Sequence, residues 1–182
     1  VHDNLISGNS VDNNAFDCGI TLASHPAFNA ETPYGVLHNT ISGNESFLNG
    51  LATGEGAGVG IFDSVPGAAN YGNIVVNNKL HDNGLPGVAM HSHTPDQNLN
   101  DNVIVGNTIY NNAADTDDAA TPGSTGINVF GVSPITGTVI AQNTITKEHD
   151  AIVANTPAAV NPHLNNLYGD FGVENIGPGT VD

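Results

Sequence analysis

Arginine and tryptophan are absent from this chain of 182 residues, and lysine occurs only as Lys79 and Lys147. Against these two cations stand 18 aspartate and glutamate residues, which give a net charge of −16 at pH 7. Because contacts to phosphate backbones require a basic surface, we expect no nucleic-acid partner. The same balance disfavours an anionic membrane surface and makes divalent cations plausible companions of the carboxylates.

Large hydrophobic side chains and cysteines are scarce as well. Aromatic residues make up only 5% of the chain, so a globule built around large side chains is not expected. Cys18 is the single cysteine, which excludes an internal disulfide, and its apolar surroundings predict a small buried hydrophobe. No run of about 18 apolar residues occurs, so we expect no membrane insertion. The chain begins in mid-repeat at Val1 without a signal peptide, which we interpret as a piece of a longer protein, extracellular or at the cell surface.

What the chain does contain is a segment of ten residues written five times. The copies are LISGNSVDNN, TISGNESFLN, IVVNNKLHDN, VIVGNTIYNN and VIAQNTITKE. Their central asparagines are Asn9, Asn44, Asn78, Asn107 and Asn143, at spacings of 35, 34, 29 and 36 residues. A branched aliphatic residue stands three positions before each of them: Ile6, Ile41, Val75, Ile104 and Ile140. A period of this length indicates a solenoid.

A second asparagine follows five positions later in four copies, and Glu148 takes its place in the fifth. Next comes a short strand that usually opens with glycine: GITLA from 19, GIFDS from 60, GVAMH from 87, GINVF from 126 and AIVAN from 151. No helical period survives over any long window, which excludes helical solenoids. The asparagines tolerate left-handed turns and can form amide ladders between stacked repeats.

The pattern I-x-G-N-x-I-x-x-N…G-I-x-L, over about residues 3–156, resembles the repeat of right-handed parallel β-helix proteins, the pectate-lyase-like superfamily. The resemblance implies an all-β fold, a right-handed parallel β-helix solenoid of about five to six coils in residues 1–156. Residues 157–182 have lost the repeat and are expected to form an irregular tail or cap. The superfamily includes polysaccharide lyases, hydrolases, epimerases, adhesins and phage spikes, so the fold alone does not assign a function. The calcium-assisted Arg or Lys base of its lyases has no counterpart here.

Loop lengths vary most on both sides of the glycine-opened strand, which predicts a walled groove with that strand as its floor. Alternation along the strand assigns outward-facing residues to this floor, where aromatic rings would stack on sugars and amides would bind hydroxyl groups. Isolated exposed rings are also common on ordinary surfaces. The candidate substrate-binding residues are Phe62, Phe130, Asn128, Asp17 and His149.

The segment MHSHTPD, residues 90–96, contains the closest grouping of side chains that could act in catalysis or bind a metal. His91 and His93 are two residues apart, His25 occupies the equivalent of His93 two repeats earlier, and Asp63 lies near the end of the intervening strand, facing inward by alternation. A histidine with a carboxylate could transfer a proton to or from a sugar. Alternatively, His91 and His93 could bind zinc or copper together with Asp96. A solvated turn that happens to carry histidines is the third alternative.

An acidic loop offers a possible metal site. Asp115, Asp117 and Asp118 fall in ADTDDAATPG, and aspartates spaced in this way can bind calcium through their oxygen atoms. The loop lacks the glycine and terminal glutamate of an EF-hand, so a solvated acidic loop explains it equally. Asp96 completes the set of candidate metal ligands, with calcium as the cofactor they favour.

Three functions remain open from the sequence. The first is a secreted carbohydrate-active module that binds or processes a polysaccharide, as a lyase, epimerase or glycoside hydrolase if it is an enzyme. A neutral glycan fits the charge of −16 better than an anionic one. The second is a non-enzymatic surface, adhesin or filament module that associates end to end with copies of itself. The third is a metal-dependent enzyme at His91 and His93.

Overall fold

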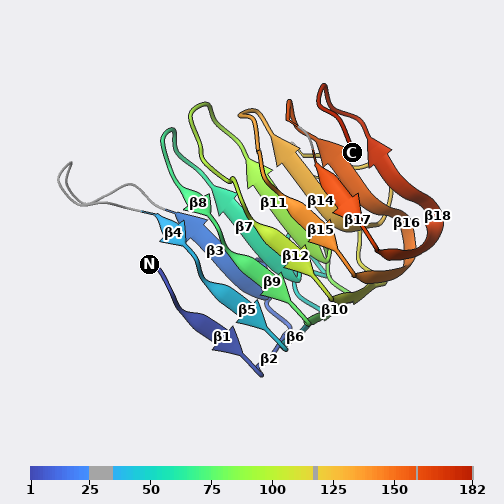
Figure 1. The fold of residues 1–182 in the computed structure, drawn as a ribbon. Helices are drawn as coiled ribbons and strands as arrows, with labels where there is room; N and C mark the ends of the chain where they lie inside the picture. Colours follow the sequence, from blue (N-terminus) through green and yellow to red (C-terminus); the bar gives the residue numbers. More distant parts are fainter. Residues whose placement is uncertain (25–34, 117–118, 159, 182) are drawn as a thin grey trace.

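The computed structural model describes residues 1–24, 35–116, 119–158 and 160–181. Throughout these residues the fold is all-β, with parallel strands in stacked sheets, an arrangement compatible with a parallel β-helix (Figure 1). We call each successive pass of the chain through these sheets a coil. Among the described residues, no helix is long and apolar enough to cross a membrane.

One strand of each repeat joins a six-stranded parallel sheet. In spatial order its strands are β1 (Leu5–Ser7), β5 (Thr40–Ser42), β9 (Ile74–Val76), β12 (Val103–Val105), β15 (Val139–Ala141) and β17 (Asn161–His163). The register places the aliphatic residues of the repeat directly opposite one another: Ile6, Ile41, Val75, Ile104 and Ile140. All but Ile6 are fully buried, so the predicted column of aliphatic side chains is confirmed.

All remaining strands except β4 and β8 form a ten-stranded sheet that folds into two walls. The first wall holds β2 (Ser10–Asp12), β6 (Glu45–Phe47), β10 (Lys79–His81) and β13 (Thr108–Tyr110). The second holds β3 (Ile20–Ser24), β7 (Val59–Asp63), β11 (Val88–Ser92) and β14 (Thr125–Gly131). The long strand β16 (Thr144–Asn155) pairs with β13 at its start and with β14 towards its end, which joins the walls. A two-stranded sheet of β4 (Val36–Leu37) and β8 (Asn70–Tyr71) lies apart from both.

Asparagine ladders run along the corners between walls. In the first, the side-chain amide of Asn44 donates to Asn78 Oδ1 at 3.0 Å, and this step repeats down to Asn143, which donates to Asn165. A second ladder joins Asn14, Asn49, Asn83 and Asn112, and ends on Glu148. Each step satisfies amide groups that would otherwise be buried without partners, a condition that costs about 1–3 kcal/mol per group. The predicted amide ladders are therefore present.

The left-handed turn positions, however, are not the ladder asparagines. Positive φ angles fall on the residue just before each of them, for example 55° at Asn77 and 67° at Gly106. This residue makes the turn, which leaves the following asparagine free to direct its side chain to the neighbouring coil. Our assignment of the left-handed conformation to the ladder residues was wrong by one position.

The segment 157–182 is more regular than an irregular tail. It contains β17, which extends the six-stranded sheet, and β18 (Asn166–Asn175), which pairs with β16. Leu167 of β18 packs against the core, whereas most other residues of β18 are exposed. Parallel pairing thus continues past residue 156, and the first asparagine ladder continues with it, because Asn165 accepts the backbone and side-chain amides of Asn143 at 2.9 and 3.0 Å.

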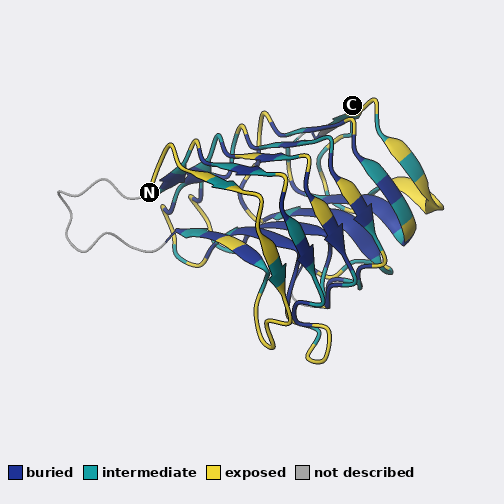
Figure 2. Ribbon diagram, turned by 90° about the horizontal axis from the view of Figure 1, so that it is seen from below, coloured by how far each residue is buried: buried dark blue, intermediate teal, exposed yellow. Residues whose placement is uncertain are grey.

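Buried residues line the inner side of the walls, and exposed residues gather at corners and projecting loops (Figure 2). The core consists of Ile, Val and Leu with one Met, Met90. Glycine takes the inward position where coils approach closely. A Cβ on Gly126 would lie 2.5 Å from Ile145 Cγ2, for example.

Candidate functional site

The connections that lead into the second wall differ greatly in length. Counted from the ladder asparagine to the next strand, the connection before β11 is short, at residues 84–87, whereas those before β7 and β14 span residues 50–58 and 113–124. The short connection leaves a hollow of about 460 Å³ between its longer neighbours. Glu55 lines it from one loop, Thr116 from the other, and Leu85 from the short connection between them.

A second, smaller pocket of about 160 Å³ shares Glu55 and Leu85 with that hollow. Together they form a continuous groove, which we call the β11 groove. The smaller pocket is lined by Asp17, Cys18, Glu55, Gly60, Phe62, Leu85, Ala89, His91 and His93. Four of the predicted site residues therefore meet here: Asp17, Phe62, His91 and His93.

His91 faces outward from β11 and is only 6% exposed. Its Nε2 lies 2.9 Å from Oδ2 of Asp115, which is itself 1% exposed. Nδ1 of His91 forms no hydrogen bond with any part of the chain that the structure describes. A histidine held through one nitrogen by a buried carboxylate, with the other nitrogen unused, has the arrangement of an oriented proton acceptor.

Asn128 fixes the loop that supplies Asp115. Its amide donates to Asp115 Oδ2 at 3.0 Å and to the backbone oxygen of Ala119 at 2.9 Å. Asn128 is fully buried as a result. Our expectation that it binds substrate on an open floor is therefore wrong: Asp115 and Ala119 cover its side chain, and it holds Asp115 in place.

Aromatic rings pack around the two histidines. The His91 and His93 ring centroids are 5.2 Å apart, and each lies 6.0 Å from the ring of Phe130. Phe130 does not line the pocket and acts as packing behind the histidines. Phe62 from β7 does line it and lies opposite His91 in the sheet register.

The register corrects one alignment. We expected Phe62 to share a row with Ala89, but it lies opposite Ala23 and His91, two residues away. The cause is a pair of glycines, Gly58 and Gly60, either of which could precede the strand. The sequence alignment used Gly60, whereas the strand begins at Val59, directly after Gly58. This shift is what places the Phe62 ring beside the histidines.

The remaining predicted residues lie elsewhere. Asp63 faces inward as expected, is fully buried, and accepts a hydrogen bond from the Ser24 amide at 3.1 Å, so it does not line the pocket. His149 is bound to Asp150 at 2.9 Å beside Phe171, also away from the groove.

The expected metal site is not assembled by the described residues. Asp96 is exposed on a turn after β11, and Asp115 is engaged with His91 and Asn128. Within residues 1–24, 35–116, 119–158 and 160–181, no group of three His, Cys, Asp or Glu side chains is arranged to hold a metal ion. His25, Asp117 and Asp118 lie outside the described residues.

Several pocket residues escaped the sequence reasoning, among them Cys18 and Glu55. Glu55 had a usable signal, because it is the single charge in the small-residue loop ATGEGAG. Burial raises the pKa of the Cys18 thiol to about 11, so it stays protonated at neutral pH and is not a nucleophile.

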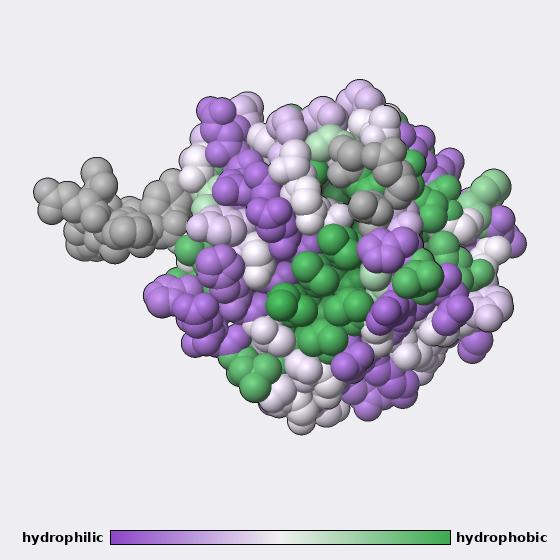
Figure 3. All heavy atoms as spheres, in the orientation of Figure 1, coloured by the Kyte–Doolittle hydropathy of each residue, from purple (hydrophilic) through white to green (hydrophobic). Residues whose placement is uncertain are grey.

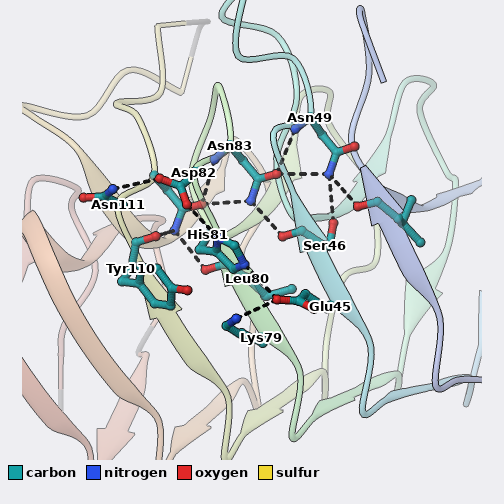
Figure 4. Close-up of polar contacts among 12 residues, drawn as sticks. Glu45, Ser46, Asn49, Lys79, Leu80, His81, Asp82, Asn83, Tyr110 and Asn111 are labelled. Atoms are coloured by element: carbon teal, nitrogen blue, oxygen red, sulfur yellow. Dashed lines mark hydrogen bonds and ion pairs between the residues drawn. The ribbon is translucent and has the colours of Figure 1, made fainter. Parts of the chain in front are cut away.

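A second polar cluster occupies the first wall, on the outward side of β6, β10 and β13 (Figure 4). The rings of Phe47, His81 and Tyr110 stack nearly parallel, with centroids 5.1 and 4.7 Å apart. Because the rings cover one another's faces, they present mainly their edges to solvent. This stack lacks the free ring faces on which sugars would bind.

Both lysines belong to this second cluster. Lys79 pairs with Glu45 at 2.6 Å, and the Nζ atoms of Lys79 and Lys147 lie 5.9 and 5.6 Å from the Tyr110 ring centroid. Figure 4 shows the Lys79–Glu45 pair beside His81 and Tyr110. Neither lysine lines the β11 groove.

Comparisons with models of protein families, with curated proteins and with solved structures give no match to this chain. The fold and the site geometry therefore carry the functional argument.

Proposed function

We propose that the chain is a carbohydrate-active module of the right-handed parallel β-helix type, related to pectate-lyase-like proteins, with five to six coils. The β11 groove would bind a polysaccharide. The open hollow and its adjoining pocket suit an extended chain with one sugar unit seated beside His91. The observation that carries this proposal is the 2.9 Å contact between His91 and the buried Asp115 at the wall of the pocket.

In this proposal His91 transfers the proton. Asp115 fixes the tautomer in which Nε2 carries hydrogen, so that Nδ1 presents a lone pair to the pocket. For hydrolysis, Nδ1 takes a proton from water, whose oxygen bonds to the anomeric carbon. The glycosidic bond breaks, and the departing oxygen takes a proton from solvent water, to which His91 later returns the proton that it accepted. The carboxylates at the pocket favour a neutral chain over a uronate.

The test is to incubate the protein with a panel of neutral polysaccharides and to measure turnover as the release of reducing ends. His91→Gln should lower turnover by about 10²–10⁴-fold, the usual contribution of a positioned acid–base group. Glutamine is chosen because His91 is buried, and alanine would leave a cavity. His163→Gln, an exposed histidine outside the groove, is the matched control. Full activity of His91→Gln would exclude His91 as the base.

Asp115→Asn separates positioning from packing. The change keeps the size of the side chain but allows the wrong histidine tautomer, so turnover should fall while the melting temperature changes little. A large loss of stability with normal turnover per folded molecule would assign Asp115 a purely structural role.

One surface favours a second candidate, a structural module that associates with copies of itself. The outer side of β9, β12 and β15 is apolar, with Ile74, Val76, Val103, Val105 and Val139, and hydrophobic residues gather at the middle of this face (Figure 3). Three strands spaced about 4.8 Å apart and about 10 Å long give a patch of roughly 150 Å², well below the ~800 Å² per partner of a stable interface. Edge strands β1 and β17 would have to contribute through end-to-end pairing. A mass that stays monomeric from low to high concentration would exclude this candidate.

A further inference from the structure

Among the described residues, the β11 groove is lined by two carboxylates and by neither of the two lysines. Asp17 and Glu55 both line the smaller pocket and are exposed. Asp17 Oδ1 accepts the backbone amide of Cys18 at 2.7 Å, and the Asp17 side chain also contacts the Cys18 thiol. The side chain of Glu55 forms no hydrogen bond or ion pair within the described ranges. Two carboxylates at one small pocket, without a protein cation beside them, create a negative potential that a bound ligand would experience.

The chain has no cation to spare for this site. It contains no arginine, and its two lysines, Lys79 and Lys147, are held around Tyr110 on the other wall. A uronate in the pocket would therefore face two carboxylates with no neutralising group. A neutral sugar would leave the carboxylates without a specific partner.

A buried polar residue, His91, lines the pocket together with Asp17 and Glu55. His91 is 6% exposed, and its Nδ1 has no hydrogen-bond partner in the described part of the chain. An imidazole nitrogen held in this way can accept a hydrogen bond from a ligand hydroxyl or ammonium group. Acceptors thus dominate the pocket: two carboxylates and one ring nitrogen face it, and all three suit a donor-rich ligand.

We propose that the β11 groove selects polysaccharides whose sugar units carry free, protonated amino groups. This inference rests on the proposed glycan-binding function and specifies its substrate class. An ammonium group in the pocket would pair with Asp17 and Glu55, while His91 Nδ1 accepts from a neighbouring donor. The Phe62 ring at the same pocket supplies an apolar surface for the sugar ring.

Binding of three oligosaccharides of equal length tests the proposal by calorimetry: a glucosamine oligomer, its fully N-acetylated form, and a galacturonate oligomer. At about pH 6 and low salt the glucosamine amines are largely protonated. Two exposed ion pairs predict an affinity for the glucosamine oligomer on the order of tenfold above that for the acetylated one. Raising the ionic strength to about 0.5 M should remove most of this preference.

The double variant Asp17→Asn with Glu55→Gln should abolish the preference. A matched control, Asp12→Asn with Asp170→Asn, removes the same charge from exposed positions outside the groove and should retain it. Equal or tighter binding of the acetylated or galacturonate oligomer by the unmodified protein would overturn the proposed selectivity and leave glycan binding intact. Failure of all three oligomers, together with the neutral panel, would remove the proposed function as well.

Discussion

Glu148 stands where the second ladder requires an asparagine, and this substitution predicts a specific pH dependence of stability. Oε1 of Glu148 accepts the backbone and side-chain amides of Asn112 at 2.9 and 3.0 Å. The residue is only 4% exposed. Burial raises the pKa of its carboxyl group from 4.5 to about 7, and the hydrogen bonds from Asn112 offset only part of this effect.

The direction in which stability changes with pH follows from the linkage between proton binding and folding. Because the folded-state pKa lies above the unfolded value, the native state binds the proton more tightly, and the resulting stability is fully present below pH 4.5. It is lost as the pH rises through about 7. At about 1.4 kcal/mol per pH unit, the complete loss is on the order of 3 kcal/mol.

Glu148→Gln removes the charge while it keeps an oxygen that can accept from Asn112. We expect the variant to unfold at the same denaturant concentration as the parent near pH 4. At pH 8 it should be more stable by up to about 3 kcal/mol, or roughly 6–12 °C in melting temperature for a chain of this size. The measurement is a series of urea titrations across this pH range, with Glu55→Gln as the control for removal of an exposed charge.

The difference between variant and parent is the informative quantity, because the repulsion of a chain with net charge −16 also changes with pH. A difference that stays constant from pH 4 to pH 8, or a variant less stable at pH 8, would refute a neutralised carboxyl group at this position.

Other predictions follow from packing and burial. Asn78→Ala should destabilise the fold by about 1–3 kcal/mol in a denaturant titration, because the buried backbone amide of Asn44 and the carbonyl oxygen of Ile41 lose their hydrogen bonds to the Asn78 side chain, whereas an exposed Asn166→Ala should cost little. Gly126→Ala should cost at least about 1–3 kcal/mol, since the new Cβ would lie 2.6 Å from the Ala151 oxygen; a thermal melt that matches the parent would contradict the close approach. Cys18 should react with iodoacetamide at pH 8 far more slowly in the native state than after denaturation, because its pKa is raised to about 11; equal rates would contradict its burial.

The repeat predicted the interior of the fold well, for a physical reason. A residue that stacks on its own equivalent must be compatible with that equivalent, so the positions of Ile41 and Asn44 recur in each coil and can be aligned without a structure. Alignment failed where two glycines competed, at Gly58 and Gly60, because either one could have opened the strand. Only backbone pairing with β11 distinguishes them.

The β11 groove was less predictable than the core because loop residues form much of it. The sequence located the walls of the groove from their variable length, and it selected His91 and His93. It did not predict that Asp115 and Ala119, from the loop before β14, contact Asn128 and bury it, nor that Asp115 reaches His91. Loop conformation depends on contacts between coils, and these leave no periodic trace in the sequence.

His81, His91 and His149 each contact a carboxylate, and their surroundings differ in ways that decide what each can do. His81 uses both ring nitrogens, Nδ1 to Asp82 at 2.6 Å and Nε2 to Glu45 at 3.1 Å, and stacks between two rings. It therefore has no nitrogen left for a ligand. His149 is bound to Asp150 and packs beside Phe171, but it lines neither the hollow nor the pocket.

Of these three histidines, only His91 combines the two features that a proton acceptor requires. Its carboxylate partner is buried, which strengthens the contact and fixes the tautomer, and its second nitrogen is unused at a pocket with room for a ligand. A solenoid satisfies most of its polar groups by repeating them, as the asparagine ladders show. His91 is a largely buried residue whose Nδ1 this repetition leaves without a partner in the described part of the chain, beside a groove shaped by unequal loops. Binding to another molecule is most favourable there.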